Sequence, residues 1–240
     1  MGVEEFFTEQ PSAVAAELAA NHGLGQWRQT FATKQGWTAR RWREWRLYIY
    51  AGGVVVTAPT GIRVAYDWKS MRVVQYLRTI NGGQADAKYV LIDPAGAALA
   101  IGIGGFPLLR KERETAGITE LTHGAPFPYP LDWGPHIQNA VAQTQLPEVL
   151  ARLERGESVN FGPYEAGRAG ITGQTRRGRA ETPWSDITVI KVRDGAVFFN
   201  PERGIRADPH RKGPDYAQLC QIPNVELFLR LCRTLSPVKG

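Results

Sequence analysis

The sequence of 240 residues predicts a mainly β protein with α-helices, an α+β fold in which one small domain occurs twice. Trp68-Lys69-Ser70-Met71-Arg72-Val73-Val74 and Trp184-Ser185-Asp186-Ile187-Thr188-Val189-Ile190 each place a Trp and two polar residues before alternating apolar positions. A Gln-x-Pro tripeptide then recurs with each helical segment, at Gln145-Leu146-Pro147 and Gln221-Ile222-Pro223. Strands followed by a helix, twice over, predict two bent antiparallel sheets, each closed by a C-terminal helix.

A short helix is expected before the first copy, over residues 11–22. Pro11 suits a first turn, Val14 and Leu18 fit one apolar stripe with the alanines, and Gly23 ends the pattern. We assign residues 1–24 to this N-terminal helical extension.

The first copy is assigned to residues 25–156. Its expected strands cover residues 26–32, 45–50, 54–57, 62–68, 89–92 and 98–103. The turns between them are predicted from Ala51-Gly52-Gly53 and Asp93-Pro94-Ala95-Gly96. Many Gly and Pro residues over 104–133 predict a long loop that the second copy lacks. A helix follows over 134–156, with a break at Pro147 because proline removes a helical hydrogen bond.

The second copy is assigned to residues 157–240, with strands resuming at Val159. Asp194-Gly195 lies between two β-rich runs and is the strongest hairpin signal in the chain. Residues 200–216 are expected to form a polar loop. The last helix is expected over 223–235, and its buried face is predicted to comprise Val225, Phe228, Leu229 and Cys232.

Composition restricts the function classes without naming one. The net charge of +6 is compatible with nucleic acid, anionic lipid or acidic protein partners. No apolar run approaches the roughly 18 residues of a membrane span, and the acidic start is unlike a signal peptide. Both cysteines, Cys220 and Cys232, are expected to be reduced. We therefore expect a cytoplasmic protein, with peripheral attachment at the inner face of the membrane as the alternative location.

The chain resembles proteins of pleckstrin-homology-like architecture, and more narrowly an uncharacterised bacterial domain-of-unknown-function family. The segments that carry the resemblance are residues 47–55, 68–71, 145–157, 160–163, 184–187 and 222–224. The resemblance implies two tandem domains of the kind that bind lipids, peptides or other proteins. It supplies no catalytic residues.

The sharpest candidate site is the basic stretch between the first two strands. Phosphate groups need several convergent cations, and a tryptophan ring is favoured at a membrane interface. Three arginines in the second copy form a weaker candidate of the same kind. The predicted anion- or lipid-binding residues are Lys34, Trp37, Arg40, Arg41, Trp42, Arg43, Arg176, Arg177 and Arg179.

Each basic stretch also has a simpler interpretation. The tryptophans can be core residues and the arginines a solvated face, and this is favoured because charge runs usually mark solvated surfaces. The acidic residues of the first 25 positions can neutralise part of the basic stretch. If that stretch is instead helical, Trp37, Arg41 and Trp45 share one face.

No pattern in the sequence predicts an enzyme, a cofactor or a metal. Gly102-Ile103-Gly104-Gly105 lacks the Lys-Ser or Lys-Thr of a phosphate loop, and the four histidines lack zinc-ligand spacing. Trp68 and Trp184 are predicted to be core anchors at equivalent positions. The expected function is that of a non-enzymatic adaptor that binds a protein or peptide. Anionic lipid is the alternative, and nucleic acid is not expected because no recognition motif is visible.

Overall fold

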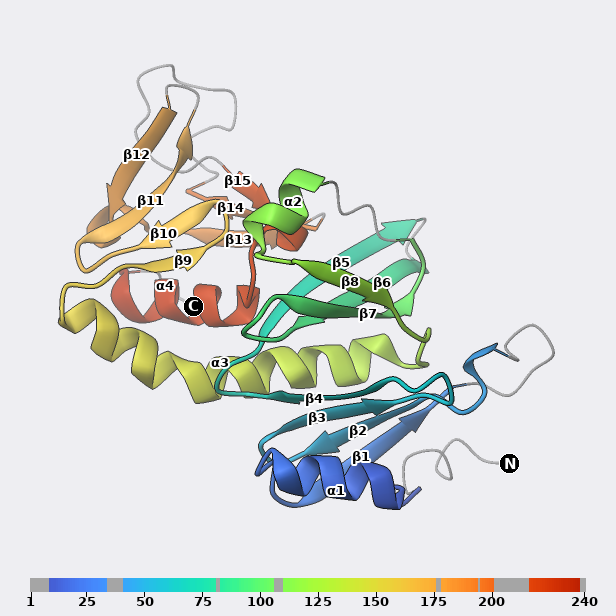
Figure 1. Cartoon of the computed structure of the whole chain (residues 1–240). Helices are drawn as coiled ribbons and strands as arrows, with labels where there is room; N and C mark the ends of the chain where they lie inside the picture. Colours follow the sequence, from blue (N-terminus) through green and yellow to red (C-terminus); the bar gives the residue numbers. More distant parts are fainter. Residues whose placement is uncertain are drawn as a thin grey trace.

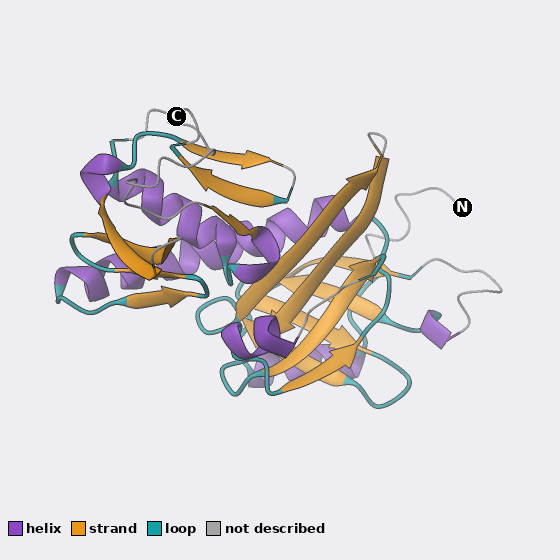
Figure 2. Cartoon of the chain, turned by 90° about the horizontal axis from the view of Figure 1, so that it is seen from above, coloured by secondary structure: helices purple, strands orange, loops and turns teal. Residues whose placement is uncertain are grey.

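The computed structural model describes residues 9–33, 41–80, 83–105, 110–175, 178–193, 195–200 and 216–237. Over these residues the protein is an α+β structure of four sheets and a few helices (Figures 1 and 2). All neighbouring strands are antiparallel except one parallel pair. The mainly β prediction with accessory helices is therefore confirmed.

The first unit, β1–β8 with residues 130–141 of helix α3, holds two four-stranded sheets of orders β1-β2-β3-β4 and β5-β6-β7-β8. Strands β7 and β8 form the parallel pair. The strands are β1 (Trp27–Ala32), β2 (Arg46–Tyr50), β3 (Gly53–Thr57), β4 (Arg63–Asp67), β5 (Arg72–Ile80), β6 (Gly83–Ile92), β7 (Ala97–Ile103) and β8 (Glu120–His123).

The second unit, β9–β15 with residues 142–154 of α3 and all of helix α4, repeats this plan with orders β12-β11-β10-β9 and β13-β14-β15. Its elements are β9 (Val159–Phe161), β10 (Tyr164–Ala166), β11 (Gly170–Thr175), β12 (Gly178–Pro183), η3 (Trp184–Asp186), β13 (Ile190–Arg193), β14 (Ala196–Phe199), β15 (Tyr216–Gln218), η5 (Leu219–Gln221) and α4 (Val225–Leu235). The hairpin predicted at Asp194-Gly195 is confirmed by the pairing of β13 with β14.

Helix α3 (Pro130–Glu154) passes through both units, as Figure 1 shows. Ile137 and Val141 lie in the first hydrophobic core, while Val149 and Leu153 lie in the second. The predicted break at Pro147 is wrong, because the helix is continuous through this residue. Proline has no N–H group, so the carbonyl group of the residue four positions before Pro147 lacks its helical donor. Pro147 is exposed, so this carbonyl group lies on a face of the helix that water can reach.

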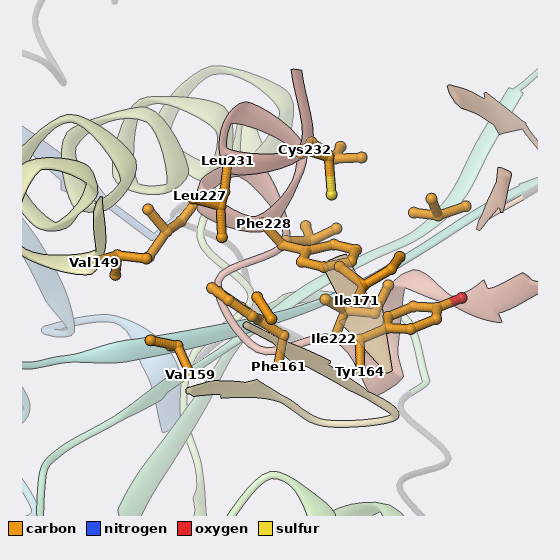
Figure 3. Close-up of a cluster of buried hydrophobic side chains, with 14 of the residues drawn as sticks. Val149, Val159, Phe161, Tyr164, Ile171, Ile222, Leu227, Phe228, Leu231 and Cys232 are labelled. Carbon is orange, nitrogen blue, oxygen red and sulfur yellow. The ribbon is translucent and has the colours of Figure 1, made fainter. Parts of the chain in front are cut away.

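The second core is built around aromatic stacking, shown in Figure 3. The rings of Tyr164 and Phe228 stack with centroids 5.0 Å apart and planes 8° apart, and Phe161 packs against the same Phe228 at 5.1 Å. All four residues predicted for the buried face of α4 lie in this core, together with Leu227 and Leu231, which were not predicted. The apolar spacing of α4 therefore identified its core face correctly.

Trp68 and Trp184 occupy equivalent positions, as predicted. Each indole donates a hydrogen bond to the carbonyl of a residue 17 positions earlier: Trp68 to Ala51 at 3.0 Å, and Trp184 to Gly167 at 3.1 Å. Both side chains are buried. Each ring therefore ties the segment that follows the last strand of a four-stranded sheet to the turn between the two middle strands of that sheet.

The two Gln-x-Pro tripeptides are not structurally equivalent, so this part of the predicted repeat is wrong. Residues 145–147 lie inside α3, whereas residues 221–223 precede α4. A three-residue pattern does not determine where a helix begins or ends. The position of each end depends on the packing of the whole helix.

The segment 104–133 is not one long loop. It contains helix α2 (Arg110–Thr115), strand β8 and the beginning of α3. Arg72 fixes the segment by donating hydrogen bonds to the carbonyls of Ala116, at 2.6 Å, and Gly117, at 3.4 Å. Strand β8 was not predicted because its pairing with β7 is long-range and because two of its four residues are exposed and the other two only half-buried.

Helix α1 (Ala13–Asn21) confirms the predicted N-terminal helix and covers the outer face of the first sheet. Its packing stripe consists of Ala15 and Ala19 with the half-buried Leu18, as predicted for Leu18 and the alanines, whereas Val14 is exposed, contrary to the prediction. Of the helices within the described residues, none has the length and apolar character needed to span a bilayer.

Candidate functional site

A groove of about 360 Å³ opens in the first unit between strand β4 and the β7–β8 pair. One wall is residues 61–66. The other is residues 97–99 with Asp93, Glu120 and Thr122. The groove therefore lies between the two sheets of the unit, where β4 and β8 are both the last strands of their sheets.

Strand β4 presents an unpaired backbone edge to this groove. Within the described residues β4 pairs only with β3. Ala58 N donates to Ile62 O and Trp68 N donates to Gly52 O, both at 2.9 Å, so residues 62, 64, 66 and 68 direct their backbone groups toward β3. Because hydrogen-bonding direction alternates along an antiparallel strand, the N–H and C=O groups of Arg63 and Ala65 point away from β3.

The inner wall of the groove is apolar and its rim is charged. Val64 and Tyr66 face the first core together with Leu99, and Arg63 is exposed at one end of β4. Glu120 is exposed on the opposite wall. Among the described residues, neither Arg63 nor Glu120 forms an ion pair. The rim therefore offers one cationic and one anionic group to a ligand.

Asp93 adds a second negative charge near Tyr66. Burial, together with the charge of Asp93, raises the pKa of the Tyr66 hydroxyl well above its ordinary range. Asp93 accepts a hydrogen bond from Ala97 N at 2.8 Å, and Ala97 is in register with Glu120 on β8. The two carboxylates therefore lie at the same end of the groove, the end at which β4 finishes.

The equivalent edge in the second unit is strand β12, and it carries a proline. Counted back from the anchoring tryptophan of each unit, Pro183 corresponds to Asp67, and Glu181 corresponds to Ala65. Proline lacks an N–H group and is a common device against unwanted pairing at sheet edges. The two edges therefore differ in kind, and β4 is the more open to a further strand.

The first basic stretch is only partly described. Lys34, Trp37 and Arg40 lie outside the described residues. The guanidinium of Arg41 lies over the Trp42 ring, 4.4 Å from its centroid, and Trp42 meets the buried Trp45 edge-on at 5.2 Å. Trp42 is therefore half-buried against the first core rather than free at the surface.

Several of the other arginines are already paired. Arg46 Nε contacts Glu9 Oε2 at 2.8 Å, so the acidic N-terminal segment neutralises part of the basic stretch, as predicted. In the second unit Arg179 Nη2 contacts Glu165 Oε2 at 3.2 Å. Arg176 and Arg177 lie outside the described residues. Arg43 is exposed.

The remaining chemical candidates are structural. In the described ranges, no group of three or more His, Cys, Asp or Glu is placed to hold a metal ion. Gly105 N donates to Asp86 Oδ1 at 2.8 Å, so the glycine run after β7 is engaged by a carboxylate rather than open to a phosphate. Burial raises the pKa of the Cys220 thiol to about 11, as expected for a packed thiol.

Sequence reasoning missed the groove because it missed one of its walls. The alternation over 62–68 identified β4, but the opposite wall depends on β8. The only signal present is the run Glu120-Leu121-Thr122-His123, in which one apolar residue, Leu121, lies among polar ones. A run of four such residues is too short to predict a strand without knowledge of its partner.

Residues 132–238 match the sequence model of a family of unknown function, DUF6585. The match begins in the first turn of α3 and covers nearly all of the second unit. The predicted resemblance to a family of unknown function is thereby confirmed over these residues. No curated protein matches the chain. No solved structure matches it either.

Proposed function

With part of the chain assigned to a family of unknown function, we propose that this protein is a non-enzymatic adaptor that binds an extended peptide segment of a partner protein. The peptide pairs with the free edge of β4 and lies in the groove toward β7 and β8. The observation that carries the proposal is that the unpaired backbone groups of Arg63 and Ala65 belong to residues lining this groove.

The repeated architecture supports an adaptor. Each unit consists of a four-stranded sheet, an anchoring tryptophan, a second sheet and a helix, which is the order of elements in a pleckstrin-homology-like domain. We propose that both units are of this type. Such a scaffold is compatible with many functions, so the argument for binding rests on the groove and not on the fold.

A peptide fits the groove better than a small molecule because the edge of β4 needs both donors and acceptors at the spacing of a strand. Pairing by strand addition supplies these from another backbone, while side-chain pockets supply specificity. Half-buried Val64 offers an apolar surface on the inner face to one side chain of the peptide, whereas Ala65 packs on the opposite face against the cluster under α1. The charged rim residues, Arg63 and Glu120, select a peptide that itself carries both signs of charge.

The proposal is tested by selecting from a displayed library of random octapeptides with the whole chain. Selected peptides are synthesised with a fluorophore, and their affinity is measured by anisotropy. Ala65→Pro removes an N–H group that points away from β3, so it blocks peptide pairing while leaving the β3–β4 ladder intact. We expect Ala65→Pro to weaken binding by about tenfold or more, because the peptide carbonyl opposite Ala65 is left without a donor, which costs about 1–3 kcal/mol.

Glu181→Pro is the matched control. It places the same substitution at the equivalent edge position of β12, and it is expected to leave peptide affinity unchanged. Thermal unfolding of both variants checks that each is folded. Failure of the library to yield any binding peptide, or equal affinity of the wild type and a folded Ala65→Pro variant, would contradict the proposal.

A further inference from the structure

We infer that the groove selects the direction and charge pattern of its peptide: the peptide runs antiparallel to β4 and carries a basic residue three positions before an acidic one. This inference rests on the proposed function. It follows from the separation of charge along the groove and from the register that the β4 edge imposes.

The charges of the groove are divided between its two ends. Asp93 and Glu120 lie at the Tyr66 end, as the pairing of Ala97 with Glu120 requires. Arg63 lies three residues earlier on β4, about 10 Å away at the usual rise of a strand. Among the described residues neither Arg63 nor Glu120 forms an ion pair, so these two charges are available to a ligand, whereas the nearby Arg72 partly offsets the charge of Asp93.

An antiparallel peptide matches this division in its own chain direction. Strand β4 runs from Arg63 toward Tyr66, so an antiparallel peptide has its amino-terminal part beside the carboxylates and its carboxyl-terminal part beside the guanidinium. Antiparallel pairs are also slightly more stable per residue than parallel ones. Backbone pairing and electrostatics therefore favour the same direction.

The register follows from Ala65, whose backbone groups pair with one residue of the peptide. Side chains of directly opposed residues lie on the same face of a sheet. Counted from the peptide residue that pairs with Ala65, the residue two positions later lies beside Arg63. The residue one position earlier lies on the inner face, beside Tyr66 and the carboxylates. The expected core pattern is a basic residue, a small residue, an apolar residue above Val64, and an acidic residue.

The test compares two labelled octapeptides of identical composition, one with the core Lys-Ala-Val-Glu and the other with Glu-Ala-Val-Lys. Wild-type protein is expected to prefer the first by about fivefold at low salt, since each exposed ion pair contributes about 0.2–1 kcal/mol. The variant Arg63→Glu with Glu120→Lys reverses the rim charges and is expected to prefer the second peptide. Added salt is expected to reduce both preferences.

Two outcomes separate this inference from the proposed function. Equal affinity for the two peptides, with binding still lost in Ala65→Pro, overturns the charge pattern while leaving strand addition supported. A preference of the wild type for Glu-Ala-Val-Lys also overturns it, since that order matches a parallel peptide. Binding of the preferred peptide that Ala65→Pro does not weaken contradicts strand addition itself.

Discussion

The side-chain amides of Gln145 and Asn224 are hydrogen-bonded to each other, with Asn224 Nδ2 donating to Gln145 Oε1 at 3.0 Å. Gln145 lies in α3, and Asn224 is the residue before α4. Both also bind the start of the first unit's second sheet. Gln145 Nε2 donates to the carbonyls of Trp68 at 2.8 Å and Met71 at 2.9 Å, and Asn224 Oδ1 accepts from Val73 N at 2.7 Å. These contacts join the two units through buried and half-buried polar groups.

Asn224→Gly is expected to lower the free energy of unfolding by about 2–4 kcal/mol, because it leaves the Val73 amide and the Gln145 oxygen without their partners. Asn224 has a φ of 52°, a conformation that glycine adopts readily. The loss of stability therefore reports the missing side-chain hydrogen bonds rather than backbone strain. Urea unfolding gives the value. Asn160→Ala, which removes one exposed hydrogen bond, is the control and is expected to cost less than about 1 kcal/mol. A similar loss in both variants would contradict a special role for Asn224.

The two anchoring tryptophans are expected to contribute equally. Trp68→Phe and Trp184→Phe each remove one indole donor from a carbonyl 17 residues away, and each is expected to lower the free energy of unfolding by about 1–2 kcal/mol. Trp27→Phe is the matched control, because the Trp27 indole donates only to the nearby Thr30 side chain and the ring is half-buried. Chemical denaturation provides the comparison. An effect at one anchor but not at the other would argue against their equivalence.

Local pattern was sufficient to predict six of the eight strands of the first unit and both long helices, but it missed β5 and β8 and did not predict how the elements meet. Alternation identified β4, and apolar spacing identified the buried face of α4. The continuity of α3 could not be predicted, because local preference at Pro147 favours a break while burial of Val149 and Leu153 in the second core favours a continued helix. Packing from distant residues decided between them.

The candidate site was predicted less well than the fold. The basic stretch drew attention because its charges are adjacent in sequence, yet Arg41 is engaged by Trp42, and Arg46 is engaged by Glu9. The groove residues Arg63, Asp93 and Glu120 are far apart in sequence and carry no motif. The pairing of β7 with β8 brings Glu120 close to Asp93, and the packing of β4 across the groove places Arg63 on the opposite wall. Both are properties of the folded chain.

Stability is expected to fall as the pH rises above about 9. Burial, aided by the negative charge of Glu112, raises the pKa of Cys220 to about 11, and burial also raises that of Cys232. A folded-state pKa above the unfolded value means that the unfolded chain releases protons first, so unfolding becomes more favourable between pH 9 and pH 11. The expected slope is up to about 1.4 kcal/mol per pH unit for each thiol.

Urea unfolding at pH 8, 9 and 10 measures this dependence. Cys220→Ala isolates the contribution of one thiol, because the raised pKa values of buried tyrosines affect the variant and the wild type alike. We expect the variant to lose less stability than the wild type over this range. Parallel pH profiles for the two proteins would contradict the assignment of a raised pKa to Cys220.

Attraction to anionic lipid through the first basic stretch remains the alternative function, and vesicle sedimentation distinguishes it from peptide binding. Each basic residue near an anionic surface contributes about 1 kcal/mol, so Arg41→Ala with Arg43→Ala is expected to weaken binding to anionic vesicles by about 30-fold at low salt. Arg110→Ala with Arg113→Ala removes the same charge from exposed positions on α2 and is the matched control. Equal losses in both pairs would show attraction by net charge alone. Absence of wild-type binding to any vesicle would exclude the lipid alternative, and it would leave the strand-addition proposal to be decided by Ala65→Pro.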